Sequence, residues 1–333
     1  MTATHESRPL LSAITVTWNA KKYVNECLRS LDRDDELSAE IIVVDNASTD
    51  GTPELIAQRF PKFKLIQNSE NLGFAKANNI GIRQSRGKYV CLINSDVVLS
   101  RGCLNGLFQY MEANFSVGVV GPQMLGPDGG VRRSSMRLPS LRNSVCRAMA
   151  ADRSSFLSRL LGGQLTSDFS HDRIADVEVL NGWFWLVRRE ALDQVGLLDE
   201  RFFIYGEDLD WCRRFREAGW RLVFYPCVSA IHYGGASSGA APVRSYVEMQ
   251  RANLQYWKKH RGLLACSVNY GILLVHHVLR LMGYSAAYLI RAENRTEVAA
   301  KIRRSWVLLA WMIGAQVDGL RKEETTWPRR SIA

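Results

Sequence analysis

The chain has 333 residues, of which 47% are hydrophobic and 23% charged, so it can bury the core of one or two domains and is not a disordered protein. Its formal net charge of +10 is concentrated at one end, because residues 241–333 carry 15 Lys and Arg against 6 Asp and Glu, whereas residues 1–240 carry 28 against 27. This charge indicates an anionic surface met by the C-terminal segment, and no nucleic-acid-binding motif accompanies it, so no nucleic acid partner is expected.

Cysteine usage and the N-terminal residues bear on the compartment. The seven cysteines are scattered and form no CxxC pair, which favours reduced thiols in a cytoplasm. Residues 1–10 lack a basic region followed by a long apolar run, so we expect no secretory signal.

Strands alternate with helices in residues 10–100. In a parallel sheet built this way, ligands lie outside the carboxyl ends of the strands, and Asp45 and Asp96 follow two of these strands. We therefore expect an α/β fold with a doubly wound, mostly parallel sheet. The predicted strands are 10–18, 40–45, 63–66 and 89–93, and the predicted helices are 23–31, 53–60 and 74–84.

The common phosphate-binding loops are missing from this half. Neither GxxxxGK[ST] nor GxGxxG follows the first strand, which disfavours an NTPase and a dinucleotide-dependent oxidoreductase. Asp45 at a strand end is suited to accept a hydrogen bond from a pyrimidine N–H, and Trp18 to stack on a base. A turn carboxylate and a core tryptophan are the alternatives.

The second half contains one strong candidate for chemistry. Residues 126–172 are polar and Arg-rich, and we expect a long loop that contacts a polyanionic acceptor or is simply solvated. Residues 176–188 predict a strand interrupted at 181–182, followed by a helix at 189–195. Glu207 and Asp208 then open a helix, where the helix dipole favours acids and where a fixed carboxylate can serve as a general base.

Four motifs carry a family resemblance. ITVTWN, VVDNASTDGT, NLGFAKANNIG and INSD, in this order and spacing, resemble the nucleotide-sugar-binding half of family 2 glycosyltransferases, closest to the rhamnosyltransferase-like subgroup. The resemblance covers roughly residues 10–240. It implies a GT-A-like domain over residues 1–240, with a nucleotide-sugar-binding half at 10–100 and an acceptor and catalytic half at 101–240.

The resemblance also implies roles for single residues. Asp208 becomes the base that deprotonates the acceptor hydroxyl, and Glu207 positions the acceptor. Asp96 becomes the metal-binding carboxylate of the family's DxD element, whose first acid is Asn94 here, with His232 as a second ligand of Mg²⁺ or Mn²⁺. The implied nucleotide-sugar site comprises Thr17, Trp18, Asn19, Asp45, Asn46, Asn71, Gly73, Lys76, Asn79, Asn94, Ser95, Asn181, Gly182 and Trp183.

The C-terminal segment, 241–333, is expected to be helical and basic. Residues 263–279 carry no Lys, Arg, Asp or Glu, which is at the short limit for a membrane span, and a second apolar piece at 306–317 follows several cations. Such paired segments are typical of helices that lie in the interface of an anionic membrane. A packed helical hairpin or a homodimer interface is the alternative.

These expectations describe an inverting, metal-dependent glycosyltransferase, cytoplasmic and peripheral on the inner face of the cytoplasmic membrane. The expected donor is dTDP-rhamnose, and the expected acceptor is a hydroxyl of a surface-polysaccharide precursor or a glycan linked to polyprenyl diphosphate. A UDP-hexose or UDP-galactofuranose donor would keep the same chemistry. A nucleotidyltransferase and a non-catalytic membrane-associated scaffold are the alternatives of another class; the former usually has a Gly-rich basic loop where this chain has Trp18-Asn19-Ala20.

Overall fold

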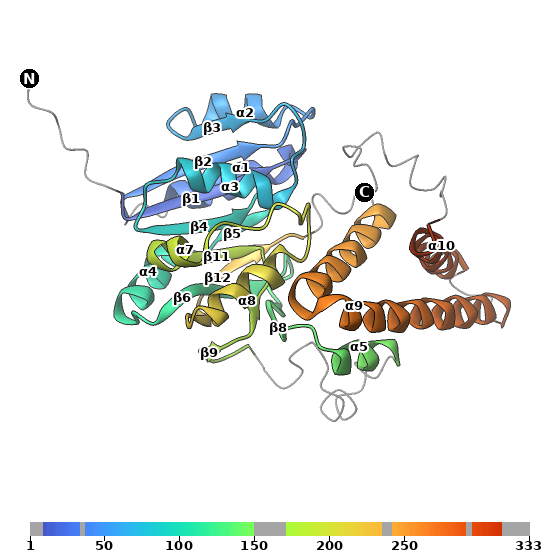
Figure 1. The fold of residues 1–333 in the computed structure, drawn as a ribbon. Coiled ribbons are helices and arrows are strands. Elements are labelled where there is room, and N and C mark those ends of the chain that lie inside the picture. Colours follow the sequence, from blue (N-terminus) through green and yellow to red (C-terminus); the bar gives the residue numbers. More distant parts are fainter. Residues whose placement is uncertain (1–8, 34–36, 150–170, 235–241, 291–294, 315–333) are drawn as a thin grey trace, which may run out of the picture. The chain divides into compact units, whose positions relative to one another are not determined.

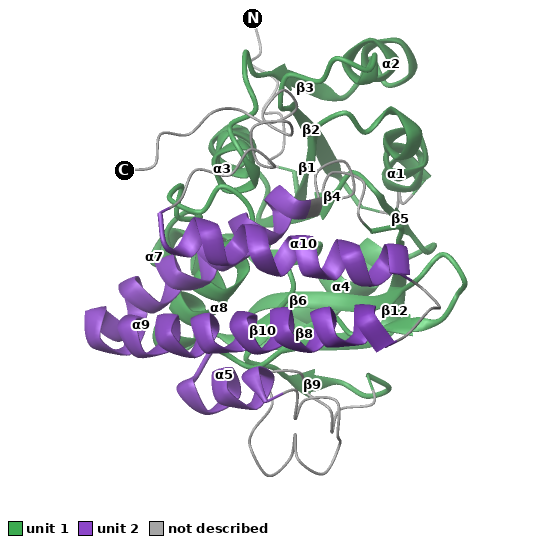
Figure 2. Ribbon diagram, turned by 90° about the vertical axis from the view of Figure 1, so that its right-hand side faces the viewer, with its two compact units in different colours: residues 1–138, 169–237 green, residues 139–168, 238–333 purple. Residues whose placement is uncertain are grey.

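The computed structural model describes residues 9–33, 37–149, 171–234, 242–290 and 295–314. The chain forms two compact units, residues 1–138 with 169–237 (unit 1) and residues 139–168 with 238–333 (unit 2), which Figure 2 shows in green and purple. Each unit is described by itself.

Unit 1 is built on a mixed sheet in the order β3–β2–β1–β4–β11–β6–β12–β5 (Figure 1), with β7 beside β6 and β9 beside β12. The pairs β3–β2, β2–β1, β1–β4 and β6–β12 are parallel, whereas β11 runs antiparallel between β4 and β6, and β5 antiparallel to β12. The strands are β1 (Leu11–Thr17), β2 (Ala39–Asp45), β3 (Lys64–Gln67), β4 (Tyr89–Asn94), β5 (Val97–Leu99), β6 (Val117–Leu125), β7 (Val131–Arg132), β9 (Ala175–Asp176), β11 (Phe184–Arg188) and β12 (Arg221–His232), with β8 (Ser135–Met136) and β10 (Val179–Leu180) paired separately.

Helices cover both faces of this sheet because alternate strand residues point to opposite sides. On one face, the side chains of α1 and α4 pack in one core cluster with Ala13 of β1 and Phe184 of β11. On the other face, Gly81 of α3 lies against Ile14, and the ring of Trp211 in α8 lies 5.4 Å from that of Trp185. The helices are α1 (Lys21–Arg33), α2 (Thr52–Arg59), α3 (Phe74–Gln84), α4 (Cys103–Ala113), α7 (Arg189–Val195) and α8 (Glu207–Glu217).

The expected doubly wound α/β sheet is confirmed, and the elements predicted before residue 100 have their ends within two residues of those observed. Two local expectations are wrong. Residues 176–188 do not form one strand. They belong to three strands with different partners: β9 pairs with β12, β10 with β8, and β11 with β4. The stretch 126–172 is not simply a loop, since it contains β7, β8 and α5 (Leu141–Ala148); residues 150–170 lie outside the described part.

Unit 2 is helical, with α5, α9 (Pro242–Ile290) and α10 (Arg295–Met312). Gly262 interrupts α9 with φ 79° and ψ 174°, a conformation that glycine adopts readily. The two arms of α9 fold back on each other, because Asn269 Nδ2 donates to Asn253 Oδ1 at 2.9 Å and Cys266 Sγ donates to the Leu254 carbonyl at 3.5 Å. The segment therefore contains a helical hairpin, against which α5 and α10 pack (Figure 2).

The second arm of α9 exposes much apolar surface. By length and composition, Val243–Ile290 is the one described helix able to cross a membrane, and only 17% of its most apolar window is buried. At 100° per residue, Leu264, Leu279 and Met282 lie on one face of the arm, and Leu264 is 82% exposed. This long apolar helix can associate with a membrane, and the arm that follows the glycine kink is by itself long enough to cross one.

Candidate active site

The first part of the site is a fixed carboxylate at the end of β2. Asp45 is only 1% exposed, and its register partner on β1, Thr17, donates through Oγ1 to Asp45 Oδ1 at 2.8 Å. Ser48 donates twice, from its backbone N–H to Oδ2 at 2.9 Å and from Oγ to Oδ1 at 2.5 Å. Three donors thus hold this carboxylate, which leaves it further acceptor capacity.

Trp18 and Asn19 form the turn that follows β1. Trp18 is half-buried, and Asn19 is exposed with φ 49°. The Asn19 N–H donates to Ser48 Oγ at 2.8 Å, and its Oδ1 accepts from the Thr49 N–H at 2.8 Å. The loops after β1 and β2 are therefore joined by hydrogen bonds between Asn19 and residues Ser48 and Thr49.

Gly73 connects these loops to the loop before α8. Its N–H donates to Asn71 Oδ1 at 3.0 Å, and its carbonyl accepts from Asn46 Nδ2 at 3.2 Å. Gly73 has φ 83°, and a Cβ built there would lie 2.4 Å from the Phe203 carbonyl oxygen. Only glycine satisfies both conditions, so the close backbone approach expected at this position is present, although the partner is Phe203.

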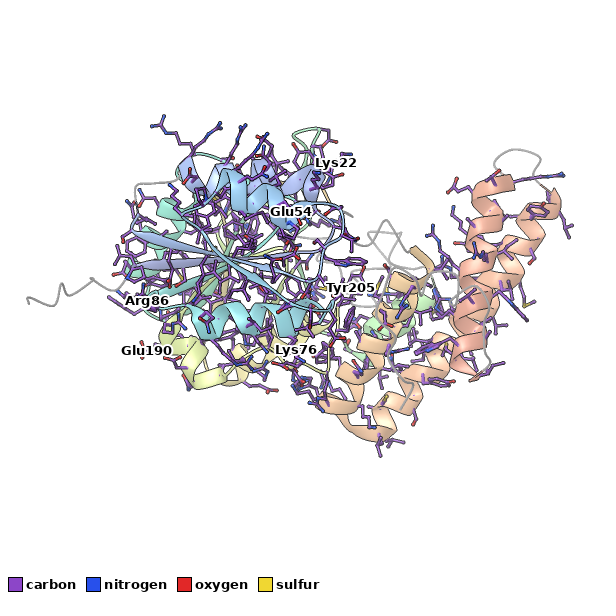
Figure 3. All side chains as sticks on the ribbon, turned by 90° about the horizontal axis from the view of Figure 1, so that it is seen from above. Lys22, Glu54, Lys76, Arg86, Glu190 and Tyr205 are labelled. Atoms are coloured by element: carbon purple, nitrogen blue, oxygen red, sulfur yellow. The ribbon has the colours of Figure 1, made fainter. Side chains whose placement is uncertain are left out.

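Lys76 and Asn79 of α3 face different surroundings. Lys76 is exposed, and Figure 3 shows it reaching away from the helix. Asn79 is buried, and its amide is used within the protein: Nδ2 donates to the Leu198 carbonyl at 2.9 Å and to Glu200 Oε1 at 3.0 Å, and Oδ1 accepts from the Leu198 N–H at 3.1 Å. Asn79 therefore holds the loop before α8 rather than pointing to a ligand.

The second part of the site joins β4 to the end of β12. Asp96 Oδ1 and His232 Nε2 are 3.2 Å apart, although 136 residues separate them in the chain. The ring of Trp183 stacks on His232 with centroids 5.6 Å apart and planes at 17°. Ser95 is buried beside Asp96, and Asn94 accepts no hydrogen bond at Oδ1 from any described residue, while its N–H donates to the Trp183 carbonyl at 3.0 Å.

The turn Asn181–Trp183 links this pair to the acids of α8. The Asn181 N–H donates to the Ser134 carbonyl at 2.9 Å, and its Oδ1 has no partner among the described residues. A Cβ at Gly182 would lie 3.5 Å from Cβ of Asp208, and the Gly182 N–H interacts with the Asp208 carboxylate. One turn thus contacts His232 through Trp183 and Asp208 through Gly182.

Glu207 and Asp208 are an interacting pair of acids. Burial raises the pKa of Glu207 well above its ordinary value, and the negative charge of Asp208 raises it further. Burial also raises the pKa of Asp208, but the N–H groups of Leu209, Gly182 and Gly206 stabilise its charged form. Burial and the charge of Asp208 therefore favour the protonated form of Glu207, whereas three backbone N–H groups favour the carboxylate form of Asp208.

The backbone before α8 adopts unusual dihedral angles. Tyr205 has φ 67° and Gly206 has φ 79°, and a non-glycine residue in this region is strained, a property that concentrates at functional sites. Figure 3 shows Tyr205 at the end of unit 1 where Lys22 and Lys76 also lie, opposite Arg86 and Glu190. Asp210 does not point into the site, because it is fully buried and pairs with Arg214 at 2.9 Å.

Two features escape the sequence analysis. Ser48 orients Asp45, and the signal for it is the spacing of an acid and a serine three residues later in a turn. Tyr233, which is 43% exposed, packs its ring 5.4 Å from that of Tyr23, next to the backbone bond from the Tyr233 N–H to the Asp96 carbonyl. Aromatic side chains of this kind are suited to contact a sugar, but a lone Tyr after His232 carries no pattern in the sequence.

The donor set fits a divalent cation shared with a ligand. In the described part of the chain, no group of three or more His, Cys, Asp and Glu is arranged to hold a metal. Asp96 and His232 supply one carboxylate and one imidazole, so diphosphate oxygens and waters would have to complete an octahedral set. The orphan Oδ1 of Asn94 next to Asp96 is a further oxygen donor.

Comparison with known proteins decides the family. A model described as Glycosyl transferase family 2 matches residues 12–196, more than half of the chain. The chain belongs to this family. It is 32% identical to the N-acetylglucosaminyl-diphospho-decaprenol L-rhamnosyltransferase of Mycobacterium tuberculosis over 70% of this chain and 79% of that protein, and 26% identical to the dTDP-rhamnosyl transferase RfbF of Shigella flexneri over 80% and 86%. The expected family and its rhamnosyltransferase-like character are confirmed.

Solved structures agree on the fold. The mannosyltransferase PcManGT of Pyrobaculum calidifontis, solved with GDP-Man and Mn²⁺, superposes with a TM-score of 0.52 at 18% identity, over 92% of this chain and 88% of that chain. GalNAc-T7, solved with UDP, GalNAc and Mn²⁺, superposes with a TM-score of 0.53 at 13% identity, over 97% of this chain and 59% of that chain. The protein is thus a glycosyltransferase with the GT-A fold expected from the sequence.

Proposed function

We propose that this family 2 glycosyltransferase is an inverting rhamnosyltransferase that transfers L-rhamnose from dTDP-rhamnose to a hydroxyl of a lipid-linked or surface-polysaccharide precursor. The observation that supports it best is the turn Asn181–Trp183, which contacts both a proton acceptor and a candidate metal pair. In an inverting transfer, the hydroxyl that attacks the anomeric carbon needs a proton acceptor on one side of this carbon. The diphosphate that leaves needs a cation on the other side.

The residues divide the reaction between them. Asp208 takes the proton of the acceptor hydroxyl while that oxygen forms a bond to the anomeric carbon and the bond from this carbon to the diphosphate breaks, with inversion. Glu207, whose protonated form is favoured by burial and by the charge of Asp208, donates a hydrogen bond to the acceptor. Asp96 and His232 would hold Mg²⁺ or Mn²⁺, which neutralises charge on the leaving diphosphate.

The donor is bound at the carboxyl ends of β1, β2 and β4. Asp45, held by Thr17 and Ser48, accepts a hydrogen bond from the base, and Trp18, in the turn after β1, stacks on the base. Lys76 is exposed at the same end and attracts the phosphates. The assignment of dTDP-rhamnose draws on the two rhamnosyltransferase relatives, and that of a lipid diphosphate acceptor on the decaprenol-linked substrate in the name of one of them.

The C-terminal unit holds the enzyme on the cytoplasmic face of the membrane through the exposed apolar face of α9. Replacing Leu264 and Met282 by Gln removes apolar surface from this face. Both side chains are well exposed, so the fold should not be disturbed. The variant should move from the membrane pellet to the soluble fraction. The matched control is Phe115→Gln in unit 1, which removes a side chain that is 73% exposed; equal sedimentation of all three proteins would contradict the membrane role.

The test of the function is a donor panel. Purified full-length protein is incubated with dTDP-rhamnose, UDP-galactose, UDP-galactofuranose and GDP-mannose, each with Mg²⁺, Mn²⁺ or EDTA, and binding and donor hydrolysis are measured. The expected result is metal-dependent preference for dTDP-rhamnose. Preference for a UDP-sugar would replace the donor and keep the mechanism, and no binding to any donor would overturn the proposal.

A further inference from the structure

The imidazole of His232 has a partner at each of its two ring nitrogens. Nε2 lies 3.2 Å from Asp96 Oδ1, and Nδ1 lies 3.4 Å from Met124 Sδ. The ring of Trp183 stacks on the imidazole with centroids 5.6 Å apart and planes at 17°. Contacts at both nitrogens and on one face therefore hold this ring in one orientation.

The pairing of β6 with β12 brings Met124 to His232 (Figure 1). The two strands are parallel here, and the register partner of Met124 is Ala230. His232 lies two residues after Ala230 on the same strand, so its side chain points to the same face of the sheet as that of Ala230. Because the alanine side chain is short, the flexible, unbranched side chain of Met124 can reach past it to the imidazole.

The two partners determine where the proton of the ring can be used. The ionised carboxylate of Asp96 and the thioether of Met124 are both hydrogen-bond acceptors. A neutral imidazole has a single N–H, and without a cation this N–H is used best at the carboxylate, which is the stronger acceptor. A cation on Nε2 needs the lone pair of that nitrogen, so the ring proton then has to be on Nδ1.

We infer that Met124 is a positioning residue for the candidate metal pair, whose sulfur accepts the Nδ1 proton of His232 when Nε2 and Asp96 hold a divalent cation. The inference rests on the part of the proposed function that assigns Mg²⁺ or Mn²⁺ to Asp96 and His232. A histidine that binds a metal usually donates its other ring N–H to a partner that fixes the ring. Met124 lies where that partner is needed.

The weakness of this acceptor bears on how the cation is held. The usual partner of a ligating histidine is a carboxylate or a carbonyl, which makes the ring a stronger ligand. A thioether is only a weak acceptor, so Met124 orients the ring and strengthens it little. The pair Asp96 and His232 is thus suited to a cation that arrives with the donor diphosphate.

The first experiment measures Mn²⁺ binding to the full-length protein in saturating dTDP, from the EPR signal of the free ion. Met124→Leu keeps the volume of the side chain and removes the acceptor, so the Nδ1 proton of the metal-bound form loses its partner. The affinity for Mn²⁺ should fall about tenfold, at the lower end of the range for such partners. Met124→Gln supplies an amide oxygen at a similar reach and should restore the wild-type affinity or exceed it.

Two controls separate this role from packing. Met111→Leu changes a fully buried methionine of α4 and should leave the Mn²⁺ affinity unchanged. In EDTA, the Tm of Met124→Leu should fall no further than that of Met111→Leu, because Met124 is only half-buried. Equal Mn²⁺ affinities of the two leucine variants would overturn the role of Met124. If Met124→Leu does not fold, Met124→Gln decides alone, and a tenfold weaker affinity in that variant would overturn the role.

Long-range ¹H–¹⁵N NMR locates the proton on the ring. The chain has six histidines, and His232→Gln assigns the signal. At a pH where the ring is neutral, addition of Mg²⁺ and dTDP should move the proton from Nε2 to Nδ1, and an Nδ1 that stays unprotonated would overturn the inference. Mn²⁺ binding that Asp96→Ala leaves unchanged would refute the metal pair of the proposed function and the inference with it, whereas the Met124 variants test the inference alone.

Discussion

Replacing Gly73 by Ala tests the connection between the donor loops and the loop before α8. Alanine at φ 83° and ψ 176° occupies a region that is essentially reserved for glycine, at a cost of about 1–3 kcal/mol. The new Cβ would also lie 2.4 Å from the Phe203 carbonyl oxygen and 2.6 Å from its ring, so the backbone must shift by about 1 Å to reach ordinary van der Waals contact.

That shift of the backbone strains the hydrogen bond between Phe74 and Phe203 and displaces the loops of the candidate donor site. The Phe74 N–H donates to the Phe203 carbonyl at 2.6 Å, and its loss costs about 1 kcal/mol more. Gly73→Ala should therefore destabilise the fold by about 2–4 kcal/mol, which lowers Tm by about 2–4 °C per kcal/mol in a domain of this size. Because the Gly73 carbonyl also accepts from Asn46, KM for the donor should rise.

The matched control is Gly196→Ala. Gly196 has φ 83° and ψ 178°, nearly the same as Gly73, but a Cβ there meets nothing within 4 Å. This variant isolates the conformational cost of about 1–3 kcal/mol from the clash. Thermal unfolding and donor kinetics are compared for the two variants. Equal Tm values with an unchanged donor KM in Gly73→Ala would refute the claim that contact with Phe203 makes glycine necessary.

Three other predictions concern the acids. Asp208→Asn should lower transfer by about 10²–10⁴-fold while donor binding, measured by calorimetry, survives; near-normal turnover would remove Asp208 as the base. Asp96→Ala should abolish the difference between Mg²⁺ and EDTA in donor binding, and an unchanged difference would place the metal elsewhere. Glu207→Gln should raise Tm increasingly above pH 4.5: the folded-state pKa of Glu207 is raised, so its stabilising protonation is present below the unfolded value of 4.5 and is lost as pH rises toward the folded one. Parallel Tm curves for Glu207→Gln and the wild type between pH 5 and 9 would contradict a buried, protonated Glu207.

The first half of the fold is predictable from the sequence because buried apolar runs and amphipathic segments alternate there. β1, β2 and β3 also pair with their neighbours along the chain, and β4 then adds on the other side of β1, as in doubly wound sheets. The second half is not, since β5 pairs with β12 and β11 enters between β4 and β6. Strands of two residues, such as β9 and β10, are also too short to show a period.

The candidate site likewise has a part that is predictable from the sequence and a part that is not. Asp96, Asp208 and His232 are predictable through family motifs, whereas no local pattern shows that one turn, Asn181–Trp183, contacts the last two of them. A sequence motif identifies a residue type and a spacing, but not whether its polar atoms are already satisfied. For this reason the sequence predicts that Asn79 contacts the ligand, whereas in the structure its buried amide bonds to the backbone of Leu198.

The position of β11 in the sheet has a consequence for how the chain is made. The edge of β4 that β11 covers stays open during synthesis until roughly 90 further residues have left the ribosome, about 5–20 s at ordinary elongation rates. Tyr89–Ile93 is apolar and β-prone, so for that time the nascent chain presents an unpaired hydrophobic strand that can pair with other chains. Slower translation lengthens this exposure, and a chain that ends before Phe184 never closes it.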